Sequence, residues 1–78
     1  MIYRYDDINK KMGLKVKLER IRMGISQEKL AEKANLSKNS VGAIERGESS
    51  PTIETLDRLA KAFNIQLHEL TNVSQMNL

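Results

Sequence analysis

The sequence predicts an all-α fold made of five short helices. Apolar residues recur at helical spacing along most of the chain, and no stretch alternates apolar and polar residues over the length of a strand. Ser26, Ser37 and Thr52, residue types that favour helix N-termini, stand where three of the apolar patterns begin. With 78 residues and no cysteine, the chain is expected to form one domain whose stability comes from helix packing.

The first helix is expected at residues 7–23. Asp6 or Asp7 is the expected N-cap, and Gly24 can adopt the left-handed conformation that ends a helix. The apolar residues form two neighbouring stripes, Ile8, Met12 and Val16 in one and Leu14, Leu18 and Ile21 in the other.

Two shorter helices follow, separated by a tight turn. Ser26 caps a helix at 27–34, which ends at Asn35, the usual non-glycine residue for a left-handed position. Ser37 caps the next helix, at 38–46. The residues expected to face inward are Leu30, Ala31 and Ala34 in the first of the two and Val41 and Ile44 in the second.

The last two helices complete the fold. Gly47 closes the third helix, Thr52 caps a helix at 53–63, and Asn64 ends it. A short helix over 65–70 is expected to turn Leu67 and Leu70 inward, and a polar, frayed segment follows it. The apolar face of the fourth helix consists of Ile53, Leu56, Leu59, Ala60 and Phe63.

Positive charge is concentrated in the first part of the chain. Residues 1–46 carry 11 Lys and Arg against 6 Asp and Glu, a net charge of +5, whereas residues 47–78 carry 2 against 4, a net charge of −2. A basic cluster attracts the phosphate backbone of nucleic acids, although a solvated lysine surface gives the same count. No apolar run reaches the ~18 residues of a membrane helix, and the N-terminus lacks the apolar stretch of a secretory signal. We therefore expect a cytoplasmic protein without a membrane role.

The helix–turn–helix at 27–46 carries the resemblance to a known family. Its layout is that of a DNA-binding unit whose second helix enters the major groove. Over residues 12–70 the sequence resembles the Cro/CI-type (XRE-like) helix-turn-helix family. The residues that carry this resemblance are Arg20, Gly24, Ile25, Ser26, Gln27, Leu30, Ala31, Leu36, Ser37, Val41, Ile44, Glu45, Arg46, Gly47, Pro51, Leu56, Leu59, Ala60 and Leu70.

The resemblance implies a five-helix, lambda-repressor-like DNA-binding domain. We expect this domain at residues 7–71, after a flexible N-terminal arm at 1–6 and before a C-terminal tail at 72–78.

The resemblance also implies which residues of the third helix contact bases. Lys38 can donate to guanine, Asn39 can pair with adenine, and Ala43 offers a methyl group to thymine. Lys38 could instead bind phosphate. Gly42 is placed on the same exposed surface, where it either permits close approach of DNA or is a neutral glycine. Because these side chains are few and small, DNA shape and dimer spacing are expected to supply part of the specificity.

Phosphate contacts are implied around the N-termini of the two short helices and at the end of the second. Gln27 matches the family's phosphate ligand, in keeping with the free N–H groups and positive dipole of a helix N-terminus, although it could simply be an exposed first residue. The expected phosphate-contacting residues are Ser26, Gln27, Ser37, Ser40 and Arg46.

Two charged residues match a structural ion pair of the family. Arg20 and Glu45 would join the first helix to the end of the third and fix the angle of the recognition helix. The alternative is two unrelated surface charges.

A homodimer is expected because DNA readers of this fold bind inverted repeats as two-fold dimers. Its surface is expected to lie near the C-terminus, with some of the apolar residues there filling the core instead. The candidates are Ile65, Leu67, Leu70 and Val73.

The function expected from these features is sequence-specific DNA binding by a transcriptional regulator, a repressor or autoregulator acting on an inverted-repeat operator in double-stranded DNA. The alternative is an antitoxin or protein-interaction adaptor in which DNA binding is secondary. We expect no enzymatic activity, cofactor or metal, because the sequence has no nucleophile–base pair, metal-ligand cluster or phosphate-binding loop, and His68 stands alone.

Overall fold

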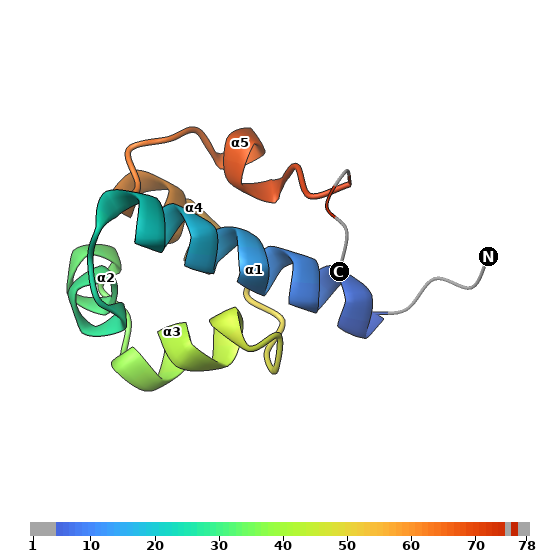
Figure 1. Ribbon diagram of the computed structural model, residues 1–78, viewed down its shortest axis with the longest axis horizontal. Coiled ribbons are helices and arrows are strands. Elements are labelled where there is room, and N and C mark those ends of the chain that lie inside the picture. The colour runs from blue at the N-terminus through green and yellow to red at the C-terminus, as the bar shows by residue number, and fades with distance from the viewer. Residues whose placement is uncertain (1–4, 75, 77–78) are drawn as a thin grey trace.

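The computed structural model describes residues 5–74 and 76, and these residues form five α-helices without a strand (Figure 1). The all-α prediction is therefore confirmed. The helices are α1 (Tyr5–Met23), α2 (Gln27–Ala34), α3 (Lys38–Glu45), α4 (Ile53–Ala62) and α5 (Leu67–Thr71). Figure 1 shows α1 as the long central helix, with α3 and α5 on different sides of it.

The first helix begins earlier than predicted. It starts at Tyr5, so Asp6 and Asp7 lie inside its first turn and neither is the N-cap. The carboxylate of Asp7, in the first turn, still suits the positive end of the helix dipole. Gly24 ends the helix with a φ of 72°, as predicted. Of the predicted N-terminal arm, residues 1–4 lie outside the described part of the chain.

The core lies where all five helices meet. Its fully buried centre contains Val16, Leu30, Val41, Leu59 and Leu70, one residue from each helix. Three residues from the predicted apolar faces are instead exposed: Leu18 by 48%, Ile21 by 55% and Ile53 by 68%.

A glycine lets α1 and α3 approach closely. Gly13, in the middle of α1, is buried against the last turn of α3, and a Cβ atom there would lie 2.8 Å from the carbonyl oxygen of Glu45 and closer still to that of Ile44. Both neighbours are backbone atoms, which cannot rotate away. The absence of a side chain at Gly13 therefore sets how near α3 sits to α1.

The C-terminal part differs in two respects from the prediction. The last helix starts at Leu67 instead of 65, because the left-handed Asn64 (φ 59°) turns the chain and the backbone N–H of Gln66 donates to Glu69 Oε2 at 2.7 Å. The tail is not simply a frayed segment: Val73 is only 2% exposed and belongs to the core, and Met76 packs against it.

Candidate nucleic-acid interface

The α2–turn–α3 unit is built by side-chain caps and one left-handed residue. Ser26 Oγ accepts from the backbone N–H of Lys29, and Ser37 Oγ accepts from that of Ser40, each at 3.0 Å. Asn35, with a φ of 56°, reverses the chain between the two helices. Since both caps satisfy N–H groups that a helix start leaves free, the ends of α2 and α3 are fixed by the sequence itself.

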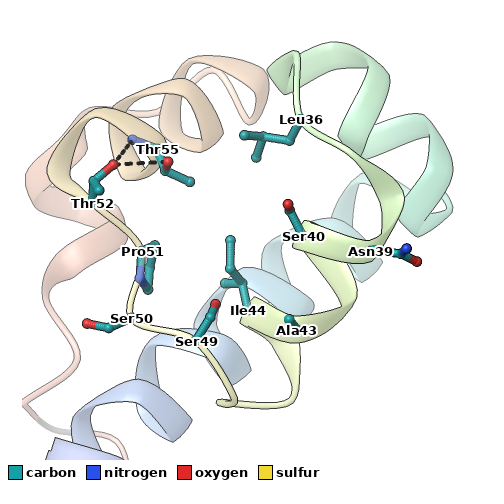
Figure 2. Close-up of a pocket in the computed structure, with 10 residues that line it drawn as sticks. All are labelled: Leu36, Asn39, Ser40, Ala43, Ile44, Ser49, Ser50, Pro51, Thr52 and Thr55. Carbon is teal, nitrogen blue, oxygen red and sulfur yellow. Dashed lines mark hydrogen bonds between the residues drawn. The ribbon is translucent and has the colours of Figure 1, made fainter.

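The N-terminal half of α3 presents polar side chains to solvent. Lys38, Asn39 and Ser40 are all exposed, and Ala43 is half-buried one turn later. Figure 2 shows Asn39 projecting away from the protein, while Ile44 points from α3 toward the inside of the molecule. The apolar side of α3 is therefore used for packing and its polar side is available to a ligand.

Gly42 does not lie on this exposed surface. It is buried, because the guanidinium of Arg46 folds back over it: a Cβ at Gly42 would lie 2.9 Å from Arg46 Nη1 and 3.8 Å from Gln27 Oε1. The prediction that Gly42 is exposed for base contact is wrong in this structure. Its backbone instead gives Arg46 room to lie along α3.

Arg46 itself is exposed and tethered. Its Nε atom forms an ion pair with Glu48 Oε2 at 3.0 Å, and both side chains are more than half exposed. Glu48 carries no sequence signal as a partner of Arg46, because it lies in the loop after α3, where side-chain direction has no periodicity.

The predicted ion pair between Arg20 and Glu45 is present, so these are not unrelated surface charges. Arg20 Nε lies 2.7 Å from Glu45 Oε2, and Arg20 Nη2 lies 3.1 Å from Glu45 Oε1. The third guanidinium nitrogen, Nη1, donates a hydrogen bond to the carbonyl oxygen of Ile25 at 2.9 Å. The hydrogen bonds to Glu45 raise the pKa of Arg20.

Gln27 is also hydrogen-bonded to the carboxylate of Glu45. Its Nε2 donates to Glu45 Oε1 at 3.0 Å, so the first residue of α2 is joined to the last residue of α3. The Glu45 side chain is only 3% exposed and accepts three hydrogen bonds. Gln27 is thus held in place at the N-terminus of α2, and the alternative of a merely exposed residue is not what the structure shows.

An open groove of about 410 Å³ lies beside α3 (Figure 2). One wall is α3 and the other is the loop leading into α4, whose N-terminus is capped by Thr52 Oγ1 accepting from the N–H of Thr55 at 3.1 Å. The hydroxyl-bearing residues that line the groove are Ser40, Ser49, Ser50, Thr52 and Thr55.

Two of the residues predicted for a dimer surface are in the core. Leu70 is 0% and Val73 is 2% exposed, which corrects their assignment to an interface. Ile65 and Leu67 are half-buried and pack against the same core. Excess apolar residues near a C-terminus do not distinguish a core from an interface, since both exclude water.

Two further features bear on function. In the described part of the chain, no group of His, Cys, Asp or Glu side chains is arranged to hold a metal ion. Over the same residues, no helix combines the length and the apolar character needed to cross a membrane.

Comparisons with known proteins place this unit in a family. The helix-turn-helix family model HTH_3 matches residues 16–70. The cryptic phage CTXphi transcriptional repressor RstR of Vibrio cholerae is 33% identical over 64 residues, which are 82% of this chain and 58% of RstR. The control protein C.SmaI of Serratia marcescens is 38% identical over 64 residues, 82% of this chain and 76% of C.SmaI.

A solved structure shows the same fold. The restriction-modification controller protein C.AhdI from Aeromonas hydrophila matches with a TM-score of 0.84 and 31% identity, covering 87% of this chain and 99% of C.AhdI. The chain thus spans little more than half of RstR but nearly the whole of C.AhdI. With more than half of its length matched by the family model, the chain belongs to the HTH_3 helix-turn-helix family, as its resemblance to Cro/CI-type proteins predicts.

Proposed function

We propose that this protein is a sequence-specific DNA-binding transcriptional regulator that places α3 in the major groove of an operator. The observation that carries the proposal is the exposed polar surface of Lys38, Asn39 and Ser40 on a short helix whose opposite side is fixed in the core. The names of the relatives, a transcriptional repressor and two controller proteins, support a function in regulation. We infer that the protein acts as a repressor or autoregulator in the cytoplasm.

Base recognition is assigned to three residues of α3. Lys38 donates to guanine O6 and N7, Asn39 pairs with adenine N6 and N7, and Ala43 contacts a thymine methyl group. Gly42 contributes indirectly, since its lack of a side chain lets the Arg46 guanidinium lie across the helix.

Phosphate binding is assigned to residues around the starts of α2 and α3 and the end of α3. At the start of α2, Ser26 and Gln27 lie beside free backbone N–H groups and the positive end of the helix dipole. Ser37, Ser40 and Arg46 flank the base-reading side chains of α3, where phosphate contacts fix the register on the duplex.

A homodimer on an inverted repeat completes the proposal. A single module buries about 600–1,000 Å² on DNA, which is small for tight specific binding, so two half-sites one helical turn apart are needed. Ile65 and Leu67 remain the proposed contributors to the dimer surface, because unlike Leu70 and Val73 they retain exposed area.

The first experiment is in vitro selection of the purified protein on a random duplex library at near-physiological salt. Enrichment of an inverted repeat supports a dimeric operator-binding regulator and gives the half-site spacing. Weak, salt-sensitive binding without an enriched sequence contradicts the proposal and favours the protein-interaction alternative.

Variants then separate the two kinds of contact. Asn39→Ala is expected to cost about 1–3 kcal/mol on the selected site and to relax specificity at one base pair, whereas Gln27→Ala weakens binding to all sequences about equally. Lys38→Ala removes the proposed guanine contact and should weaken binding to the selected site. Its control is Lys61→Ala, which removes a positive charge from α4. Equal effects of Asn39→Ala and Gln27→Ala on specific and random DNA would contradict the assigned roles.

A further inference from the structure

The outer side of α1 carries an apolar stripe that the fold does not cover. At about 100° per residue, Leu14, Leu18 and Ile21 fall within about 60° of one another, on the side opposite Met12 and Val16. Leu18 is 48% and Ile21 is 55% exposed and Leu14 is half-buried, whereas Met12 and Val16 are buried. Single exposed apolar residues are common, but a row at i, i+4 and i+7 is a continuous surface along two turns.

Positive charge borders the stripe on both sides. By the same angular spacing, Lys10 and Lys17 lie along one edge, and Lys11, Lys15 and Arg22 lie along the other. Lys15 and Arg22 each pair with Glu19 at 3.5 Å. Within the described residues, the other three lysines take part in no ion pair. We call these three apolar and five basic residues the α1 outer face.

We propose that the α1 outer face is a docking surface for an acidic amphipathic helix of another protein. Carboxylates along the two edges of such a helix pair with the two rows of cations, and its apolar side packs on Leu18 and Ile21. A helix laid along a helix fits the linear shape of the stripe. A second copy of the same face does not fit, because its cations would stand opposite these cations.

The surface is separate from the proposed DNA reader. The α3 helix contacts α1 through Gly13 and Arg20, which lie about a third of a turn from the stripe. Of the basic residues at the edges of the face, Lys10 packs against Gly47, directly after α3. Figure 1 shows α3 and α5 on different sides of α1, so both are packed against its flanks. Partner docking therefore leaves the exposed residues of α3 available to DNA.

The probe that tests the proposal is a synthetic acidic peptide with leucines at i, i+4 and i+7 and glutamates at the flanking positions. A control peptide has the same composition with its leucines spread around the helix. Binding is mapped by amide chemical shifts of the isotope-labelled full chain, and affinity is measured by fluorescence anisotropy at low and high salt.

The matched variants exchange exposed apolar residues in and outside the face. Leu18→Gln combined with Ile21→Gln is expected to lower affinity for the acidic peptide at least about tenfold, because it removes both apolar anchors. Ile53→Gln, which alters an isoleucine that is 68% exposed on α4, should bind the peptide like the unaltered protein. Both variants should bind operator DNA normally, which distinguishes this proposal from the function of α3.

The expected result is a set of shifts confined to the α1 outer face, with weaker binding of the control peptide. Absence of binding, equal binding of both peptides, or an unaffected double variant would overturn the proposal. Evidence for a different occupant would also overturn the proposal. One such result is self-association that depends on Leu18 and Ile21, measured by sedimentation, and the other is binding of anionic phosphatidylglycerol vesicles through the same residues.

Discussion

Replacing Gly13 by alanine tests whether the close approach of α1 and α3 fixes the recognition helix. The substitution adds one methyl group to the middle of α1, where alanine favours the helix by about 1 kcal/mol over glycine. On helix propensity alone, Gly13→Ala should stabilise the protein. The structure predicts the opposite sign.

The reason is the position of the new Cβ atom, 2.8 Å from the carbonyl oxygen of Glu45 and nearer to that of Ile44. Ordinary contact begins near 3.4 Å, so the last turn of α3 must move away from α1. Overpacking of this kind costs typically about 1–3 kcal/mol, and here both neighbours are backbone atoms, which puts the cost at or above the upper end. After subtraction of the gain in propensity, we expect a net loss of about 2 kcal/mol.

A loss of that size lowers the Tm of a domain of this length by about 8–16 °C. The assay is thermal unfolding followed by circular dichroism, with DNA affinity measured below the transition. Because the displaced segment contains Glu45, we expect weaker binding to the selected operator even where the variant is fully folded.

Gly42→Ala is the matched control, since it makes the same change in the middle of α3. There the new Cβ meets Arg46 Nη1 at 2.9 Å, the end of a flexible and exposed side chain that can move. We expect the free energy of unfolding to be unchanged or to rise by up to about 1 kcal/mol. The Tm should therefore equal or exceed that of the unaltered protein. An unchanged or raised Tm for Gly13→Ala, or equal losses for both variants, would refute the argument from packing.

Four further variants test the hydrogen bonds around Glu45 and the turn between α2 and α3. Arg20→Ala leaves the nearly buried Glu45 carboxylate with one donor, Gln27, and should cost about 2–4 kcal/mol in urea unfolding; an unchanged midpoint and unchanged DNA affinity would contradict its role. Glu45→Gln should cost less, because the Arg20 side chain left without a carboxylate is 15% exposed, whereas Glu45 is 3% exposed, and the glutamine oxygen still accepts a hydrogen bond from Arg20. Asn35→Ala forces alanine into a left-handed conformation and should lower stability by about 1 kcal/mol, whereas Asn35→Gly should not, in the same unfolding assay.

The helices could be predicted from sequence because their ends are encoded locally. Ser26, Ser37 and Thr52 each bond a backbone N–H within their own first turn, and Asn35 and Asn64 adopt the left-handed conformation that their side chains tolerate. These signals need no information from distant parts of the chain. Consequently α2, α3 and α4 begin at the predicted residues and end within one residue of them.

Burial was less predictable, because helical spacing identifies an apolar face of a helix but not whether another part of the protein covers it. Ile53 continues the apolar face of α4 in sequence, yet it lies at the first position of the helix, where no neighbour covers it. Leu18 and Ile21 share the spacing of core residues and lie on the opposite side of α1. Val73 shows the reverse case, a residue expected at a dimer surface in the tail that completes the core.

In the candidate site, too, some features could be predicted from the sequence and others could not. The Arg20–Glu45 pair was predictable from the family resemblance, since both residues stand at matched positions. The burial of Gly42 was not, because it depends on where the long Arg46 side chain lies. Gly13 carried a signal that sequence reasoning could have used: a glycine in a helix interior costs stability and usually marks a close approach.

The network around Glu45 explains how so short a recognition helix keeps one orientation. The buried side chains of α3, Val41 and Ile44, hold it against the core, but apolar contacts are non-directional and permit rotation about the helix axis. The hydrogen bonds from Arg20 and Gln27 are directional, and they reach Glu45 from two different helices. Because Gln27 also starts α2, a phosphate bound there would be linked through one carboxylate to the helix that reads the bases. Loss of Glu45 should therefore change the angle of α3 on DNA more than it changes the packing of the core.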